Sequence, residues 1–271
     1  MDADAHELAS AAWEANATCW DDYMGDEGNA FVNALIWPAT ERLLPMAEGM
    51  RLLDAACGNG LYARRLAARG CHVQAFDVSP TLIQRATARA EAAGLSDQIR
   101  FHVLDGADAD ALSTHLSARS LDGAICHMAL MDMPAIRPLF DALARALKPG
   151  APLVFSVSHP CLNHPRAHHL LRAHEVDGRP VTQAAMEITA YASSYTVQTV
   201  ALSHQPHTNP FYHRSLQVLL GEAFGAGLVC DGIEEPTFEP PPTDETPRAG
   251  WNGHFAEFPP VLVCRLRAPG A

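Results

Sequence analysis

Short apolar runs alternate with longer helix-like segments between residues 51 and 155, and this alternation restricts the fold more than any other feature. Strand-length runs separated by helices of ten or more residues are typical of a parallel sheet joined by right-handed crossovers. Two further apolar runs follow near the end of the chain. The sequence therefore predicts an α/β fold with a seven-stranded, mostly parallel sheet flanked by helices. The expected strands are 51–56, 72–76, 99–103, 122–127, 153–157, 228–234 and 261–266.

Helix boundaries in this region carry clear signals. Ser79 and Pro80 place a capping hydroxyl and an N-terminal proline before a helix that Gly94 closes. Pro134 opens a further helix that ends at residues 148–150, Lys-Pro-Gly, where glycine permits the left-handed conformation common after helices. A polar, glycine-bearing loop is expected at 21–29.

The composition limits where such a protein works and what it binds. The chain has a formal net charge of −12, one lysine, and no apolar run long enough to cross a membrane. Its N-terminus is acidic, unlike a secretory signal, and its seven cysteines stand singly without a metal-binding pair. We therefore expect a soluble, cytoplasmic protein without a metal, a monomer or homodimer, that binds neither membranes nor nucleic acid.

A glycine turn at residues 57–60 directly follows the first apolar strand. Such a turn brings bare backbone close to a ligand at the carboxyl edge of a parallel sheet, and Asp77 ends the next strand, where a carboxylate can accept ribose hydroxyls. Residues 58–63 also fit the loose dinucleotide pattern G-x-G-x-x-A, so an NAD-dependent oxidoreductase is an alternative. That alternative lacks a Tyr-x-x-x-Lys pair, because Lys148 is the only lysine.

An ordered set of motifs separates these alternatives. The segments 53–60, 75–79, 103–108 and 121–128, followed by the turn and strand at 147–155, together resemble the class I S-adenosylmethionine-dependent methyltransferase family over about residues 30–160. The resemblance implies a Rossmann-like fold with an N-terminal helical lid. After residue 158 the strand-helix alternation lapses, which indicates an insertion after strand five. The single domain then divides into the lid (1–47), the cofactor-binding core (51–157), an acceptor-site cap (158–212) and a C-terminal helix with the last two strands (213–271).

The resemblance implies S-adenosylmethionine as cofactor and S-adenosylhomocysteine as product. Gly58 and Gly60 would line the methionine moiety, Asp77 the ribose and Asp105 the adenine amino group. Asp54 either contacts the cofactor or braces the loop, and Ala56 stands where glycine is commoner. The expected cofactor-binding residues are Tyr23, Asp54, Ala56, Gly58, Asn59, Gly60, Asp77, Val78, Asp105, Gly106, His127 and Met128.

The acceptor is less constrained by sequence. A small-molecule metabolite methylated at O, N or C is expected, with His159 or His213 as general base, since a histidine suits proton abstraction near neutral pH. The expected substrate-binding residues are Trp37, Tyr212, Arg214 and Trp251. The histidines at 164–174 are expected in a solvated loop. A non-catalytic cofactor-binding protein on the same fold is a further alternative.

Overall fold

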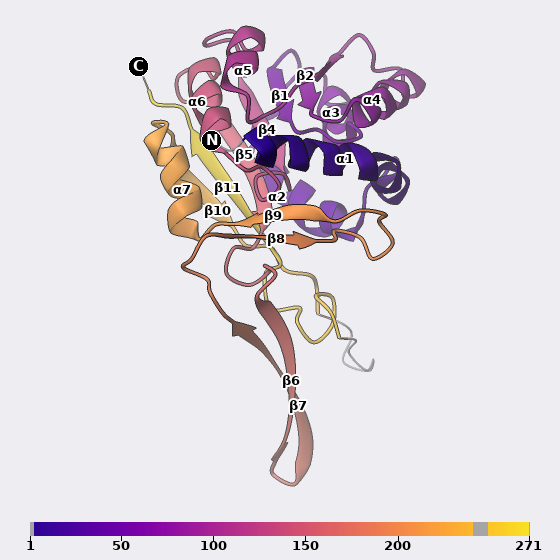
Figure 1. Cartoon of the computed structure of the whole chain (residues 1–271), viewed down its shortest axis with the longest axis vertical. Coiled ribbons are helices and arrows are strands. Elements are labelled where there is room, and N and C mark those ends of the chain that lie inside the picture. Colours follow the sequence, from indigo (N-terminus) through magenta and orange to yellow (C-terminus); the bar gives the residue numbers. More distant parts are fainter. Residues whose placement is uncertain (1–2, 241–248, 271) are drawn as a thin grey trace.

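Seven strands form one twisted sheet in the order β10-β11-β5-β4-β1-β2-β3, with helices on both faces (Figure 1). The computed structural model describes residues 3–240 and 249–270. β11 is antiparallel to both of its neighbours, and the other neighbouring strands are parallel. The predicted α/β class and mostly parallel seven-stranded sheet are thereby confirmed. The strands are β1 (Arg51–Ala55), β2 (His72–Asp77), β3 (Ile99–Val103), β4 (Gly123–His127), β5 (Pro152–Ser158), β10 (Val229–Glu234) and β11 (Val261–Arg267).

Alternate side chains of the central strands enter two apolar cores, one on each face of the sheet. On β5, Leu153 and Phe155 join one core while Val154 joins the other, as the two-residue period of a strand requires. The first core contains residues of α5 (Ala109–His115), α6 (Arg137–Ala146) and α7 (Leu216–Gly225). The second contains residues of η1 (Phe31–Ile36), α2 (Trp37–Leu43), α3 (Leu61–Ala67) and α4 (Pro80–Ala92).

The strand order reverses between β1 and β4. The chain proceeds from β1 outward to β2 and β3, then returns to place β4 on the other side of β1. At such a reversal the connections leave the carboxyl ends of the two strands in opposite directions, which opens a crevice that binds ligands in open α/β sheets. The glycine turn after β1 and His127 at the end of β4 both lie at this crevice.

Helix α1 (Ala3–Met24) begins the N-terminal region and contacts α4 and β9. It continues through Met24, so Asp21 lies in a helix and the expected loop at 21–29 is confined to the residues after it. Within the described residues, no helix combines the length and apolarity needed to cross a membrane.

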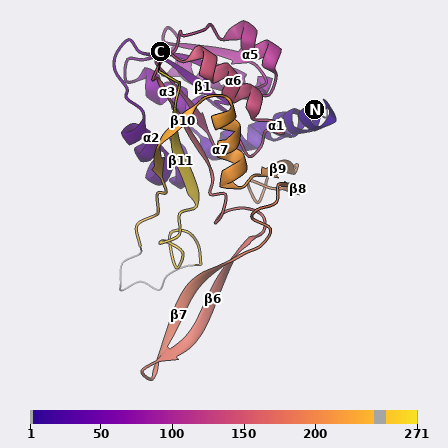
Figure 2. The same cartoon turned by 90° about the vertical axis from the view of Figure 1, so that its left-hand side faces the viewer.

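The insertion after β5 contains two hairpins, β6 (Ala167–Val176) with β7 (Arg179–Ile188) and β8 (Tyr195–Thr199) with β9 (Asn209–His213). The β6–β7 hairpin projects away from the α/β body (Figure 2). The expectation of a histidine-rich loop at 164–174 is wrong, because most of it is strand β6. Asp177 and Gly178, both at positive φ, form the Asp-Gly turn that favours a tight hairpin.

The connection between β4 and α6 is longer than predicted. Helix α6 begins at Arg137, three residues after Pro134, because Pro138 occupies its first turn and Ile136 its N-cap. The residues between β4 and α6 therefore form a loop, and this loop lies at the crevice. Near the other end of the chain, the prolines at 240–242 predict an extended surface loop over residues 236–250, and residues 241–248 of it lie outside the described residues.

Candidate active site

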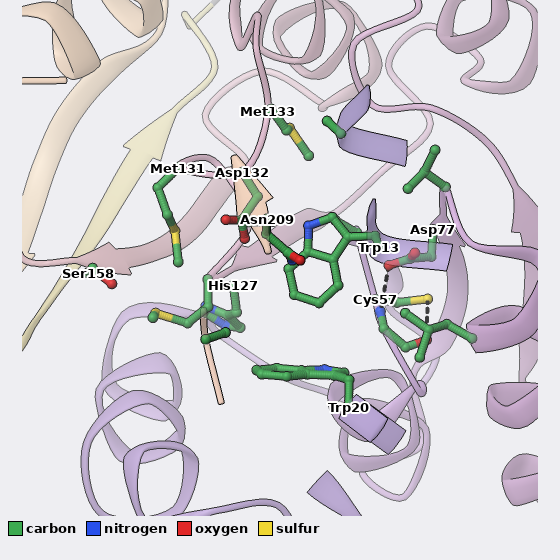
Figure 3. A pocket seen from close by; sticks show the side chains of 18 of the residues that line it. Trp13, Trp20, Cys57, Asp77, His127, Met131, Asp132, Met133, Ser158 and Asn209 are labelled. Carbon is green, nitrogen blue, oxygen red and sulfur yellow. Dashed lines mark hydrogen bonds between the residues drawn. The ribbon is translucent and has the colours of Figure 1, made fainter. Parts of the chain in front are cut away.

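A cavity of about 600 Å³ lies at the carboxyl ends of β1, β2, β4 and β5. Its wall combines α1, the glycine turn, the loop after β4 and the insertion. In Figure 3, Asp77 and Cys57 lie at one side of the cavity, and Met131 and Asp132 at the other. We call these the Asp77 end and the Asp132 end.

The glycine turn depends on left-handed backbone at several positions. Ala56 has a φ of +56° and Gly58 a φ of +55°. Both residues line the cavity, and so does Asn59. Gly60 has φ +73°, and a Cβ there would lie 2.9 Å from the Ala86 Cβ. Gly60 therefore packs α3 against α4 and is absent from the described cavity lining.

The Asp77 carboxylate connects the glycine turn to the start of α4 through two hydrogen bonds. Its Oδ2 accepts the Gly58 N–H at 2.8 Å and its Oδ1 accepts the Ser79 N–H at 3.0 Å. Burial raises the pKa of Asp77, with these backbone hydrogen bonds opposing the shift. Asp77 lines the cavity, so its remaining lone pairs can accept the two hydroxyls of a ribose.

Three other predicted residues share the Asp77 end. Val78, Asp105 and Gly106 all line the cavity. Asp105 accepts the Ala107 N–H at 2.8 Å through Oδ1, and its Oδ2 lies 3.6 Å from the His6 Nδ1 on α1. This carboxylate is accordingly placed to receive a donor from a ligand that extends beyond Asp77.

Asp54 lies beneath the turn, outside the described cavity lining. It is 1% exposed, burial raises its pKa to about 8, and the Ala63 N–H of α3 is its hydrogen-bond donor. Its Oδ2 has no partner in the described structure. Of the two roles left open by the sequence, this geometry favours bracing of the loop.

His127 is fixed as a neutral ring at the end of β4. The Thr40 hydroxyl donates to the Ile36 carbonyl at 2.7 Å, so it accepts from His127 Nε2 at 3.1 Å. Nδ1 consequently lacks a hydrogen and accepts from the Ser156 hydroxyl at 3.1 Å. Burial lowers the pKa of His127 to about 3. The ring and Met128, at φ +53°, both line the cavity, but neither ring nitrogen is free to act as a base.

Helix α1 forms one wall of the cavity, and side chains at two positions along it are hydrogen-bonded to the rest of the protein. Asp21 accepts the Asn59 side-chain amide at 3.1 Å and Arg89 Nε at 2.9 Å. Nearer the start of the helix, Asn16 donates to Asn209 of β9 at 2.6 Å. Tyr23 lines the cavity with 45% of its surface exposed. Trp13 and Trp20 of the same helix pack edge to face and line the cavity.

The two histidines proposed as bases lie off the described cavity lining. His159 Nδ1 accepts the N–H groups of Cys161 and Leu162 at 3.2 Å, and Nε2 lies 2.7 Å from Glu235 Oε1. His213 is 2% exposed and donates from Nε2 to the Tyr191 carbonyl at 2.8 Å. Both rings hold neighbouring backbone in place, and the geometry does not support either as the base.

The predicted substrate-binding residues separate into two groups. Trp251 lines the cavity, whereas Trp37, Tyr212 and Arg214 lie outside its described lining. Trp37 is covered by the guanidinium of Arg65, 5.2 Å from the centre of its ring. Arg214 instead donates to three carbonyl groups of the loop after β4, those of Leu130, Met133 and Pro134.

Sequence reasoning missed several polar side chains that line the cavity: Tyr62, Asp132, His164 and Asn209. Within the described residues, the Tyr62 hydroxyl, His164 Nε2 and Asn209 Nδ2 are buried without a hydrogen-bond partner. One local signal was present. Asp132 is a single carboxylate in the apolar segment 129–134, directly after the fourth predicted strand.

Comparisons with known proteins agree with this architecture. Residues 52–150 match the sequence profile of a family described as "Methyltransferase domain". A crystal structure of an S-adenosylmethionine-dependent methyltransferase from Mesorhizobium loti is 27% identical, with a TM-score of 0.66. The match covers 90% of this chain and 100% of that one.

Two curated relatives differ in the acceptors that their names indicate. The ubiquinone biosynthesis O-methyltransferase of Xylella fastidiosa is 28% identical over 137 residues, covering 51% of this chain and 53% of the relative. The tRNA 5-carboxymethoxyuridine methyltransferase of Escherichia coli is 32% identical over 135 residues, covering 48% and 50%. The chain thus spans about half the length of the curated relatives it matches.

Proposed function

We propose that this chain, whose residues 52–150 match the methyltransferase-domain family, is a class I S-adenosylmethionine-dependent methyltransferase that methylates a small molecule within the cavity described above. The observation that supports this best is one continuous cavity that joins the Asp77 end to the Asp132 end. S-adenosylmethionine supplies a methyl group already activated on a sulfonium. The protein's task is therefore alignment of an acceptor atom with the S–CH₃ bond, which can contribute an effective molarity of about 10⁵ M or more.

The residues at the Asp77 end fit this cofactor. Gly58 and Asn59 leave room for a methionine chain beside the turn, and the buried Asp77 carboxylate can accept both ribose hydroxyls. Asp105 can accept the adenine amino group. The three carboxyl groups in the cavity lining, which include Asp132, suit a ligand that carries positive charge.

The lining of the cavity favours a small acceptor that is neutral or cationic. Among its described residues there is neither arginine nor lysine, the side chains that usually bind phosphate or carboxylate. The Asp132 end presents apolar side chains that include Met131 and Phe211. Together with the net charge of −12, these features favour a small amphipathic molecule over a nucleic acid.

Calorimetric titration with S-adenosylhomocysteine tests the proposal. We expect Asp77→Asn to weaken binding about thirtyfold, because charge-assisted hydrogen bonds contribute roughly 1.5–3 kcal/mol. Asp122→Asn is the matched control, since Asp122 also accepts a backbone N–H, from Arg51, but at the opposite edge of the sheet. It should retain wild-type affinity.

Absence of S-adenosylhomocysteine binding to the wild-type protein, with thermal protection by NAD(H), would overturn the proposal in favour of the oxidoreductase. Methyl transfer itself is measured with labelled cofactor and a metabolite extract. Binding without incorporation of label into any metabolite would support the non-catalytic alternative.

A further inference from the structure

Asp132 is a carboxyl group that the described protein does not use. It lies in the loop after β4, lines the cavity and makes no side-chain hydrogen bond within the described residues. Its neighbours Met131 and Met133 are apolar, and burial raises the pKa of Asp132 well above its ordinary value. Asp132 is only partly buried, so a ligand that fills the cavity would remove its remaining water, and a desolvated carboxyl group is costly unless the ligand supplies a partner. Figure 3 shows its carboxylate pointing into the cavity.

Residues at the end of β9 and directly after it hold the loop that carries Asp132. Arg214 donates to the carbonyls of Met133 and Pro134 at 2.7 and 3.0 Å, and to that of Leu130 at 2.9 Å. The Tyr212 N–H donates to the Met131 carbonyl at 2.7 Å. These bonds fix the backbone on both sides of Asp132. The backbone that carries this carboxyl group is consequently in place before a ligand arrives.

A second unpartnered group lies on β9. Asn209 is 3% exposed and lines the cavity. Its Oδ1 accepts from Asn16 Nδ2 at 2.6 Å and from Gln205 Nε2 at 3.3 Å, which fixes the amide so that Nδ2 is the atom without a described partner.

His164 supplies a third unpartnered group. Its Nδ1 accepts from the Tyr195 hydroxyl at 2.6 Å and the Arg166 N–H at 3.3 Å, so Nε2 carries the hydrogen. That N–H is buried without a described partner, and burial lowers the pKa of His164 to about 4, which keeps the ring neutral. Of the three carboxyl groups in the cavity lining, Asp77 and Asp105 already accept backbone N–H groups, so Asp132 is the proton acceptor without a described partner, and it lies in a lining that also holds fixed donors.

We infer that Asp132 contacts the nucleophilic atom of the acceptor, a hydroxyl or amine that carries a proton, and takes that proton during methyl transfer. The inference rests on the proposed function and narrows it to O- or N-methylation. The acceptor X–H bond breaks and an X–CH₃ bond forms, while the S–CH₃ electron pair returns to sulfur to give S-adenosylhomocysteine. The proton passes to the Asp132 carboxylate and then to water.

Charge in the occupied cavity supports this role. The sulfonium of the cofactor is a cation in a poorly solvated space, and a nearby cation favours the ionised form of a carboxyl group. Bound cofactor would therefore offset the effect of burial on Asp132 and leave a carboxylate ready to accept a proton. The two histidines predicted from sequence as bases lack this opportunity. Both ring nitrogens of His159 are already bonded, His213 Nε2 donates to the Tyr191 carbonyl, and neither residue belongs to the described cavity lining.

Analogues of the cofactor test the inference without knowledge of the natural acceptor. In these analogues a two- to four-carbon tether replaces the methyl group and ends in an amine, a hydroxyl or a methyl. We expect the wild-type protein to bind the amine or hydroxyl tether at least tenfold more tightly than the methyl tether of matching length. Asp132→Asn should lose most of this preference and bind S-adenosylhomocysteine normally.

Asp22→Asn is the matched control, because Asp22 is an exposed carboxylate on α1 outside the described cavity lining. It should keep the wild-type preference. Absence of any polar preference in the wild-type protein, or a preference that survives in Asp132→Asn, would overturn the inference. A wild-type protein that binds no S-adenosylhomocysteine would instead overturn the proposed function, so the two failures are distinguishable.

Discussion

The two ends of the cavity use their polar groups in opposite ways. At the Asp77 end, both oxygens of Asp77 accept backbone N–H groups, and Asp105 accepts a third. At the Asp132 end, the carboxyl group of Asp132 and the amide nitrogen of Asn209 have no described partner. The carboxylates at the Asp77 end already hold backbone N–H groups in place. The polar groups at the Asp132 end have no described partner and can bind a ligand.

The two ends also differ in how far along the chain their contacts reach. Asp77 and Gly58 are 19 residues apart, within one strand-helix-strand unit. Arg214 and Met133 are 81 residues apart, and Asn16 and Asn209 are 193 apart. The Asp77 end is therefore a property of a local motif, and the Asp132 end exists only after the insertion and α1 have docked.

The largest expected effect is on stability and comes from Gly60, whose left-handed backbone and lack of a side chain allow the glycine turn to form. Gly60→Ala should lower the free energy of unfolding by about 3 kcal/mol, since it adds left-handed strain to an overlap with Ala86 and Phe101. Urea denaturation measures this. Gly94→Ala is the control, because Gly94 has a similar φ of +70° but no heavy atom within 4 Å of the added Cβ. Equal losses in the two variants would show that packing against α4 is unimportant.

Asp54 should make stability depend on pH. Its folded-state pKa of about 8 lies above the unfolded value near 4, so the folded protein keeps a proton that the unfolded chain releases. Its contribution is intact below about pH 4 and is lost as pH rises toward 8, by up to about 1.4 kcal/mol per pH unit. Asp54→Asn should flatten this decline in thermal unfolding between pH 5 and 7. A variant with the wild-type slope would contradict the assignment.

Arg214 allows the Asp132 end to be disturbed alone. Arg214→Ala should cost about 2 kcal/mol, because it leaves three loop carbonyls without their charged donor. The preference for amine or hydroxyl tethers should fall, with S-adenosylhomocysteine affinity retained. Arg145→Ala, which removes an exposed arginine from α6, is the control for calorimetry and denaturation. A parallel fall in S-adenosylhomocysteine affinity would show that the two ends are not independent.

The smallest expected effect concerns two alanines with left-handed backbone. Ala56 and Ala190 have φ of +56° and +54°, so replacing either by glycine relieves strain but raises the entropy of the unfolded chain. We expect each variant to gain about 0.5 kcal/mol in denaturation. Only Ala56→Gly, which widens the Asp77 end, should bind S-adenosylhomocysteine up to a few-fold more tightly. Equal affinities in both variants would contradict this.

The same distinction explains what could be predicted from sequence. The sheet, the glycine turn and the positions of Asp77 and Asp105 follow from hydrophobic period, glycine conformation and local motifs, and the fold and family resemblance are confirmed. His159 was placed correctly after the fifth strand, but the direction of its ring depends on Glu235, 76 residues away. Asp132 was overlooked for a similar reason, since Arg214 determines how its loop is held.

Helix α1 contributes Trp13, Trp20 and Tyr23 to the cavity lining, and its bonds reach Asn59 at one end and Asn209 at the other. Any displacement of this helix changes both ends at once. A ligand that orders α1 lowers the entropic cost of binding the other ligand, and thermodynamic linkage makes the benefit reciprocal. Coupling through this helix would appear as an acceptor affinity that differs between the cofactor-bound and the cofactor-free protein.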